Sequence, residues 1–400
     1  MTRQEYRVAL IGAGFMGAVH SQAWASVGRF FPGPAPTLAV LAARDQRATS
    51  AAAERLGWSE WSTDWRAVVE RDDIDIVDVA TPGDSHPEIV TAALEAGKHV
   101  ICEKPLANSV DDAEAMTAVA AAARRRGIRS MVAFNYRRVP AIALARQYLE
   151  EGRLGEIRHV RADYLQDWIA DPDFPLVWRL QKERAGSGAL GDIGAHVLDL
   201  AEYLSGQRIT SVSGTLRTFV PRRPIPHNSE GLSATAGEGF GDVTVDDAAA
   251  IHARFDGGAM GTIEATRFAT GRKNAMRIEV NGSLGSISFD FESLNELLYH
   301  DARIPSRDAG FRRILVTEPD HPYAGAWWPP GHGLGYEHAF VHEFADFLEC
   351  LEAGRDPEPS FATGLHVQRV LDAVSRSADA DSRWVDIPPS HTSETEGASQ

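Results

Sequence analysis

Hydrophobic and polar positions follow two alternating periods in the first third of the chain. Short apolar runs that suit buried strands are separated by longer segments with the spacing of amphipathic helices. The predicted strands cover residues 6–11, 38–42, 74–80, 99–102 and 130–134. The predicted helices cover residues 15–27, 49–56, 86–96 and 110–126. This alternation indicates a parallel sheet that is covered by helices on both faces.

The pattern changes in the later part of the chain. One helix is predicted at residues 192–204, and strand-like runs with short links follow it. These runs cover residues 209–218, 248–255, 260–267, 275–280, 286–290 and 296–299. The links carry turn signals such as Asp256-Gly257-Gly258, which favour an antiparallel meander. Amphipathic helices at residues 337–352 and 362–376 complete an α+β pattern.

This change divides the chain into two predicted domains, an α/β domain at residues 1–135 and an α+β domain at residues 136–387. Two domains are expected for 400 residues, because single hydrophobic cores stop growing at about 250–300 residues. Residues 388–400 are polar and are predicted to be a disordered tail. Residues 227–246 and 305–335 are predicted to be irregular, and long loops in compact domains are functional or disordered.

The composition narrows the class of protein. The chain is 44% hydrophobic and 24% charged, which is typical of a soluble globular protein. A net charge of −16 argues against nucleic acid or an anionic membrane surface as a partner. The only cysteines, Cys102 and Cys350, suit a reducing compartment. Without a signal-peptide pattern or an apolar stretch of about 20 residues, we expect a cytoplasmic protein.

A glycine-rich motif follows the first predicted strand. Gly12, Gly14 and Gly17 enclose Ala13, Phe15 and Met16 in a G-x-G-x-x-G pattern, directly before a predicted helix. The first glycine allows a tight turn, the second lets the backbone approach a pyrophosphate, and the third lets helix and strand pack closely. The helix N-terminus then attracts the phosphates. The motif predicts binding of a dinucleotide.

The end of the second strand bears on which dinucleotide binds. An acidic residue there usually takes the ribose hydroxyls of NAD, but Ala43 occupies that place and Arg44 follows. Arg44 could meet the 2′-phosphate of NADP or be a solvated charge. NAD(H) and NADP(H) therefore both stay open.

Loops after three further strands should meet at the same edge of the sheet, where cofactors bind. They contain the stretches 81–86, 103–105 and 134–137. The residues that we expect to line the cofactor site are Thr81, Pro82, His86, Glu103, Lys104 and Asn135.

A second glycine-rich stretch, residues 186–196, opens a helix of the second domain. Asp192 and His196 are four residues apart, so they share a helix face. The positive helix start favours an ionised Asp192 and disfavours a protonated His196, and a neutral histidine held by a carboxylate is a good general base. Taken singly, Asp192 could be a helix cap and His196 a core residue. Together with Lys104 they indicate a catalytic site.

In combination, Gly12 to Gly17, Glu103-Lys104-Pro105 and Asp192-x-x-x-His196 resemble the Gfo/Idh/MocA oxidoreductase family. The resemblance implies a Rossmann domain with a parallel, doubly wound sheet, followed by an α+β domain with a large, mostly antiparallel open sheet. It also implies a homodimer or homotetramer and a Lys104–Pro105 peptide bond that can be cis.

The resemblance further implies a role for each residue of the catalytic set. Lys104 would hydrogen-bond the reacting oxygen, His196 would take the hydroxyl proton, and Asp192 would orient His196. No metal is then needed. Further stretches resemble family members that oxidise the C3 hydroxyl of an anhydrosugar with NAD, which gives NAD a slight preference. They are residues 132–138, 164–168, 178–182 and 185–193.

Planar aromatic and polar side chains should contact the sugar. Besides the catalytic set, the candidates are Tyr136, Tyr164, Gln166, Trp178, Arg179 and Tyr336. Core packing is the alternative for the aromatic ones. Trp327 and Trp328 could line the pocket or a subunit contact.

The function expected from the sequence is that of an NAD(P)-dependent sugar dehydrogenase. It would oxidise a secondary hydroxyl, at C3, of a pyranose, an anhydrosugar such as levoglucosan, a glycoside or a cyclitol. One alternative is a glycosidase that retains NAD and oxidises C3 transiently. A non-catalytic dinucleotide-binding module is the other alternative.

Overall fold

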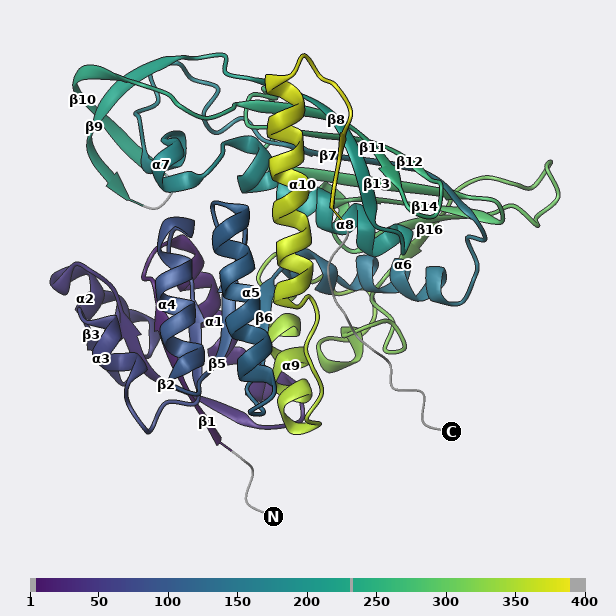
Figure 1. Ribbon diagram of the computed structural model, residues 1–400. Coiled ribbons are helices and arrows are strands. Elements are labelled where there is room, and N and C mark those ends of the chain that lie inside the picture. Colours follow the sequence, from purple (N-terminus) through teal and green to yellow (C-terminus); the bar gives the residue numbers. More distant parts are fainter. Residues whose placement is uncertain (1–4, 231–232, 389–400) are drawn as a thin grey trace.

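The computed structural model describes residues 5–230 and 233–388. Its first sheet has six parallel strands in the order β3-β2-β1-β4-β5-β6 (Figure 1). They are β1 (Glu5–Ile11), β2 (Ala35–Ala42), β3 (Glu60–Ser62), β4 (Ile76–Val79), β5 (His99–Glu103) and β6 (Ser130–Ala133). This is the strand order of a dinucleotide-binding Rossmann sheet, and the loops after β1 and β4 meet where the order reverses.

Helices flank this sheet, as the alternating sequence pattern predicts. They are α1 (Phe15–Phe30), α2 (Gln46–Leu56), α3 (Trp65–Val69), α4 (His86–Glu95) and α5 (Val110–Arg124). The predicted elements of this region are all present, with ends shifted by a few residues. The short elements β3 and α3 are additional. The parallel Rossmann sheet is therefore confirmed.

The second sheet has nine strands in the order β16-β15-β14-β13-β7-β12-β11-β8-β17. They are β7 (Ile157–Leu165), β8 (Ile209–Arg217), β11 (Ala248–Phe255), β12 (Met260–Thr266), β13 (Ala275–Gly282), β14 (Gly285–Asp290), β15 (Glu296–Asp301), β16 (Arg312–Leu315) and β17 (Val385–Asp386). The sheet is mostly antiparallel, as predicted.

The simple meander is wrong at the centre of this sheet. Strand β7 lies between β12 and β13, and it runs parallel to β12 and antiparallel to β13. Its side chains alternate, with Ile157, Val160 and Ala162 buried between more exposed residues. A strand from an early part of the chain therefore separates two that are neighbours in sequence.

The remaining helices complete the fold, and α6, α8 and α10 among them pack against strands of this sheet. They are η2 (Asn135–Arg138), α6 (Pro140–Glu150), η3 (Trp178–Leu180), α7 (Lys182–Ala185), η4 (Leu190–Gly194), α8 (Ala195–Ser205), η5 (Phe291–Ser293), η6 (Ala324–Ala326), α9 (His338–Glu352) and α10 (Phe361–Asp379), with η1 (Gly83–Ser85) in the first domain. Helix α6 is not among the predicted elements, although Pro140 in its first turn and its alanines are typical helix signals.

The irregular segment predicted at residues 227–246 is partly wrong, because β9 (Arg222–Glu230) and β10 (Ser233–Asp242) pair as an antiparallel ribbon. Pro224, Pro226 and several glycines lower its strand propensity. The register shifts between Thr235 and Phe240, a stretch that contains Gly239 at φ +84°. Because the pairing is irregular, the sequence of this ribbon lacks the regular alternation of hydrophobic and polar residues that predicts a strand. Residues 305–335 are irregular as predicted, apart from β16 and η6.

The last two helices connect the domains. Helix α9 packs on α1, and Phe340 and Phe344 share a buried cluster with Trp24. Helix α10 packs on β8 and also on α5 (Figure 1). The division of the chain after residue 135 stays a prediction, and the predicted tail lies largely outside the described residues.

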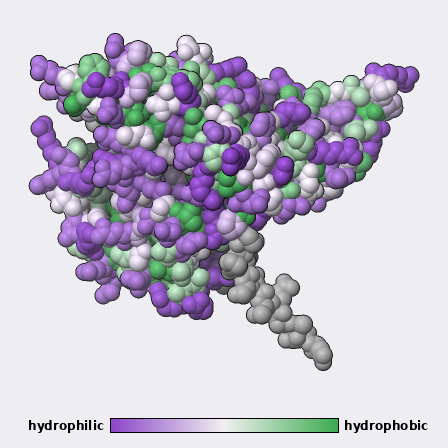
Figure 2. All heavy atoms as spheres, turned by 45° about the horizontal axis from the view of Figure 1, so that its top comes forward, coloured by the Kyte–Doolittle hydropathy of each residue, from purple (hydrophilic) through white to green (hydrophobic). Residues whose placement is uncertain are grey.

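Hydrophilic residues predominate on the face shown in Figure 2, with scattered hydrophobic ones between them. Within the described ranges, no helix has both the length and the apolar character needed to cross a bilayer. The cytoplasmic location stays a prediction.

Candidate active site

A cleft of about 910 Å³ lies along the carboxyl edge of the Rossmann sheet. Its lining comes from loops after β1, β2, β4 and β5 on one side and from the second domain on the other. The predicted site residues that line it are Gly12, Gly14, Phe15, Met16, Ala43, Arg44, Thr81, Pro82, Glu103, Lys104, Asn135, Tyr136, Tyr164, Gln166, Trp178, Arg179, Asp192, His196 and Tyr336. Gly17 and His86 are not part of this lining.

The glycine motif has the geometry of a phosphate cradle. Gly12 has φ +120°, and a Cβ there would lie 2.5 Å from the Ala80 carbonyl oxygen. Gly14 precedes α1 and has no atom within 4 Å of a Cβ, so a ligand can approach its backbone. A Cβ at Gly17 would overlap the Gly12 carbonyl oxygen, so this glycine serves close packing instead of lining the cleft. The first turn of α1 carries no acidic residue. The site therefore fits the pyrophosphate of a dinucleotide.

The end of β2 leaves the ribose pocket without a free acid at the usual position. Ala43 lines the cleft, and the carboxylate of Asp45 accepts a hydrogen bond from Ala48 N at 2.7 Å as the cap of α2. Arg44 is exposed at the rim. This arrangement is compatible with either cofactor.

His86 supports the loop after β4 from behind. Its ring is buried, with Nε2 2.9 Å from the Thr81 carbonyl oxygen and Nδ1 3.2 Å from that of Leu106. Burial lowers the pKa of His86, so the ring is neutral. The side chain shapes the Thr81–Pro82 turn without entering the cleft.

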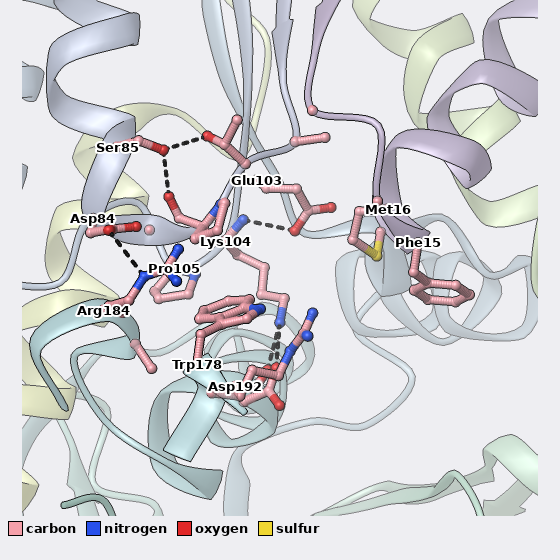
Figure 3. Close-up of a pocket in the computed structure, with 18 of the residues that line it drawn as sticks. Phe15, Met16, Asp84, Ser85, Glu103, Lys104, Pro105, Trp178, Arg184 and Asp192 are labelled. Atoms are coloured by element: carbon pink, nitrogen blue, oxygen red, sulfur yellow. Dashed lines mark hydrogen bonds and ion pairs between the residues drawn. The ribbon is translucent and has the colours of Figure 1, made fainter. Parts of the chain in front are cut away.

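Lys104 crosses the cleft from the end of β5 (Figure 3). The Lys104–Pro105 peptide bond is cis, which confirms the prediction. Lys104 Nζ donates to the backbone carbonyl of Asp192 at 2.5 Å and lies 3.6 Å from Asp192 Oδ1. Residues 88 positions apart thus meet in one site.

A buried aspartate holds the glycine-rich stretch of the second domain. Asp246 Oδ1 accepts from Gly188 N and Oδ2 accepts from Leu190 N, both at 2.7 Å. A Cβ at Gly188 would overlap the Asp246 carbonyl oxygen, so only glycine allows this approach. Residues 190–194 form one π-helical turn before α8 begins. Such turns are frequent at functional sites. This turn presents Asp192 to the cleft.

The charges around Asp192 are concentrated. Burial would raise the pKa of its carboxyl, but Lys104, Arg179 and Arg267 outweigh it and hold the pKa at about 2. Arg267 is fully buried, with Nη1 3.4 Å from Asp192 Oδ2. Asp192 is therefore an anion throughout the physiological range.

His196 is buried beside this charge pair. Burial and the Lys104 cation lower its pKa well below the usual value, so the ring is neutral and can accept a proton. Its ring centroid lies 4.5 Å from that of Tyr136. Among the described residues, His196 Nδ1 has no hydrogen-bond partner, and the Asp192 carboxylate contacts Lys104 and Arg267. Asp192 is expected to orient His196, but the described residues show no direct contact between the two side chains that would do so.

A polar chain forms the far wall of the cleft. The hydroxyls of Tyr136 and Tyr164 are 2.6 Å apart, and Tyr164 Oη donates to Asn274 Oδ1 at 2.7 Å. Gln166 Nε2 donates to the same Asn274 oxygen at 2.8 Å. The Arg179 guanidinium stacks 4.4 Å from the Trp178 ring. These groups provide the mixture of flat and polar surface that a polyol needs.

The structure adds residues that the sequence reasoning missed. Arg267, Asn274 and Asn108 line the cleft. Arg267 and Asn274 lie next to the ends of β12 and β13, so a full register of the second sheet would have pointed to them. In the described chain, residues 305–335 contribute nothing to the lining. Trp327 instead packs against Phe30, with the two ring centroids 4.2 Å apart.

The site combines a dinucleotide cradle, a cation that crosses the cleft and a neutral histidine. A fixed cation can stabilise developing negative charge on an oxygen, and the histidine can take a proton. The arrangement thus suits removal of a hydride from an alcohol carbon.

Comparison with known proteins agrees with this chemistry. Residues 6–134 match the description "Oxidoreductase family, NAD-binding Rossmann fold", and residues 142–288 match "GFO/IDH/MocA C-terminal domain". Levoglucosan dehydrogenase from Pseudarthrobacter phenanthrenivorans is 45% identical over 391 residues, covering 96% of this chain and 99% of that enzyme. Inositol 2-dehydrogenase from Rhizobium meliloti is 27% identical, covering 95% of this chain and 99% of that enzyme.

Solved structures extend the likeness to three dimensions. An oxidoreductase domain protein from Kribbella flavida has a TM-score of 0.92 and 60% identity, covering 96% of this chain and 100% of the other. Levoglucosan dehydrogenase in complex with NADH and levoglucosan has a TM-score of 0.89 and 44% identity, with the same coverage. By sequence and by fold, the chain belongs to the Gfo/Idh/MocA family of oxidoreductases with an NAD-binding Rossmann domain.

Proposed function

We propose that the chain is an NAD-dependent sugar dehydrogenase that oxidises a secondary hydroxyl to a ketone. Its substrate is a pyranose, an anhydrosugar such as levoglucosan, a glycoside or a cyclitol, and the reacting hydroxyl is at C3. The observation that carries the proposal is the convergence of Lys104, Asp192 and His196 in the cleft that holds the dinucleotide cradle.

Each residue has a separate task in this reaction. The Lys104 ammonium binds the reacting oxygen and stabilises its alkoxide character. The neutral His196 ring takes the hydroxyl proton. Asp192 holds Lys104 through its backbone carbonyl and through its carboxylate. When bound, the nicotinamide ring supplies the hydride acceptor.

The wall of Tyr136, Tyr164, Gln166 and Asn274 favours a substrate with several hydroxyls, because its polar atoms are already ordered. Ordered groups lose little entropy when a ligand binds. Two relatives are named for levoglucosan and for inositol, and both compounds carry several hydroxyl groups. Trp178, Arg179 and Tyr336 complete the proposed sugar site.

We propose NAD as the preferred cofactor, since the matched domain is described as NAD-binding. Ala43 and Arg44 leave room for the 2′-phosphate of NADP. Arg44→Ala should therefore weaken NADPH binding by at most about fivefold, the range of exposed ion pairs, and leave NADH binding unchanged. Equal weakening of both reduced cofactors, measured by fluorescence titration, would argue against this role.

The decisive experiment is a substrate panel of monosaccharides, anhydrosugars, glycosides and inositols, each assayed with NAD and NADP. Stoichiometric formation of reduced cofactor at 340 nm together with a keto product is the expected result. Release of a glycosidic substituent without net reduction would instead identify the glycosidase with retained NAD. Cofactor binding without any turnover would leave the non-catalytic module.

The family resemblance also supports a homodimer or homotetramer. Light scattering on the purified protein measures this directly, and a monomer would contradict it.

A further inference from the structure

A set of buried charged groups lies behind Lys104. His20 of α1 is fully buried, with Nδ1 3.0 Å from both carboxylate oxygens of Asp78 on β4. Its Nε2 is 3.1 Å from Glu103 Oε1 on β5. The other Glu103 oxygen, Oε2, accepts from the backbone N–H of Lys104 at 3.0 Å (Figure 3). The contacts form an unbroken chain from Asp78 to the backbone of Lys104.

The geometry determines the protonation state of the His20 ring. A neutral imidazole donates from one nitrogen and accepts at the other, whereas an imidazolium donates from both. Both His20 nitrogens face carboxylate oxygens, which only accept. Unlike the carbonyl oxygens around the neutral His86 ring, these acceptors are carboxylates, and their negative charge favours a His20 ring that carries both protons. Burial opposes this charge, but Asp78 and Glu103 outweigh it and raise the pKa of His20 to about 10.

Other elements that pack against His20 add little competing charge. On α1 itself, Trp24 Nε1 donates to Asp78 Oδ2 at 2.8 Å. From α9, the rings of Phe340 and Phe344 contact the imidazole. Glu343 of α9 is also buried, and burial raises its pKa to about 8, so it is mainly neutral at pH 7. The charge of Arg138 on η2 lowers the pKa of Glu343 and partly offsets the effect of burial.

Glu103 lines the cleft, although only 5% of its surface is exposed. Burial disfavours its charge, while His20 and Lys104 lower its pKa, so it is ionised. An ionised Glu103 keeps its hydrogen bond to the backbone N–H of Lys104. Lys104 is the residue whose side chain crosses the cleft. Without His20, the buried Asp78 and Glu103 would lose the cation that they share.

We propose that His20 is a permanently charged positioning residue, which with Asp78 fixes Glu103 against the Lys104 backbone and so aims Lys104 at the reacting oxygen. The inference rests on the proposed function, since it deepens the account of the same site. His20 and Asp78 lie too deep to touch the substrate, and they act through Glu103.

The experiment compares His20→Gln with a matched variant, His342→Gln. His342 is also fully buried, but its Nε2 accepts from Trp327 Nε1 at 2.8 Å and its pKa is lowered to about 3, so it carries no charge. Both variants should lose stability. Only His20→Gln should lower kcat, by about 10- to 100-fold at pH 7, because small misplacements of a catalytic group cost this much.

The pH profile separates positioning from mere folding. In His20→Gln, Glu103 loses its cation, its pKa rises and it becomes protonated near neutral pH. The profile of kcat should then gain an ionisation between about pH 6 and 9, with kcat rising as Glu103 ionises, that the wild type and His342→Gln lack. The double variant His20→Gln/Glu103→Gln should lose this added ionisation. An unchanged kcat and pH profile in folded His20→Gln would overturn the proposal.

A second measurement does not depend on turnover. In protein labelled with ¹⁵N-histidine, the His20 ring should show two protonated nitrogens at pH 8, and its signal is assigned in the wild type by its nuclear Overhauser contacts with the Phe340 and Phe344 rings. A neutral ring at pH 8 would overturn the proposal even if His20→Gln fails to fold. If the wild type turns over no member of the panel while His20 is doubly protonated, the failure lies with the proposed function and not with the state of His20.

Discussion

The two halves of the proposed catalytic site rest on different kinds of support. In the first domain, contacts run from Asp78 through His20 and Glu103 to the Lys104 backbone, and in the proposed role their charges hold this strand end. In the second domain, Asp246 accepts two backbone hydrogen bonds directly, and close contact at Gly188 sets the geometry. One half therefore depends on a protonation state and the other on shape. Each predicted effect below tests this contrast.

The largest effect is expected from the catalytic groups, one in each half. Lys104→Met should lower kcat by about 10²–10³ and His196→Gln by about 10²–10⁴, the ranges for loss of a charge-stabilising group and of a general base. Steady-state kinetics at saturating cofactor measures both.

Because the pKa of His196 is lowered, wild-type kcat should not fall between pH 8 and pH 6 through protonation of this ring.

Lys98→Met provides the matched control. Lys98 directly precedes the opposite end of β5, is 7% exposed and donates to the Arg71 carbonyl at 2.5 Å. Its loss should cost stability and leave kcat unchanged. A large fall in kcat for Lys98→Met would show that any disturbance of β5 is enough to stop the reaction.

Gly188→Ala tests whether shape supports the second half. The added Cβ would overlap the Asp246 carbonyl oxygen, so the turn before Asp192 has to shift, at a cost of about 3 kcal/mol. Thermal unfolding measures this cost, and kcat should fall at every pH by the same factor. Gly194→Ala, whose Cβ would meet its nearest atoms at 3.4 Å, should be milder.

Asp246→Asn removes the negative charge but keeps one oxygen. The asparagine can accept from Gly188 N or from Leu190 N but not equally from both, so the loss should be about 2 kcal/mol of stability. The shape of the kcat profile with pH should stay that of the wild type. A new ionisation in this variant would remove the contrast with His20→Gln.

The smallest effect at neutral pH is expected from Glu343→Gln, next to the first half. Burial raises the pKa of Glu343 from 4.5 to about 8, so the folded protein binds more protons than the unfolded chain between these values. This group therefore makes stability fall as pH rises through that window, by about 1 kcal/mol between pH 7 and 8. Glu343→Gln should flatten this dependence in denaturant unfolding. An unchanged slope would mean that Glu343 is already ionised at pH 7.

Much of the fold and of the site was predictable from local patterns. The strand and helix periods of the Rossmann domain, the turn at Gly12 and the i, i+4 spacing of Asp192 and His196 all have short-range signals in the sequence. The expectation that Lys104 joins this pair comes from the combination of motifs that resembles the family. The family assignment and the fold class that they imply are confirmed.

The features that were not predicted depend on contacts between residues far apart in the sequence. Such contacts leave no local pattern of hydrophobic and polar positions. Strand β7 was missed as the centre of the second sheet because its partners lie about a hundred residues later. From the sequence, Arg267 is only the last residue of a predicted strand. Its place in the site becomes visible when the fold brings it beside Asp192. His20 reads as one polar residue on a helix, and only the stacking of α1 on β4 and β5 joins it to Asp78 and Glu103.

The packing of α9 against α1 has a consequence for biosynthesis. The nucleotide-binding half leaves the ribosome first, yet the ring that covers Trp24, Phe344 at a centroid distance of 4.1 Å, is made more than 300 residues later. Domains ordinarily fold as they emerge. Here the early half stays incomplete until α9 has been made, because the apolar surface around Trp24 lacks its cover until then. A fragment that ends at residue 135 would keep that exposed surface permanently.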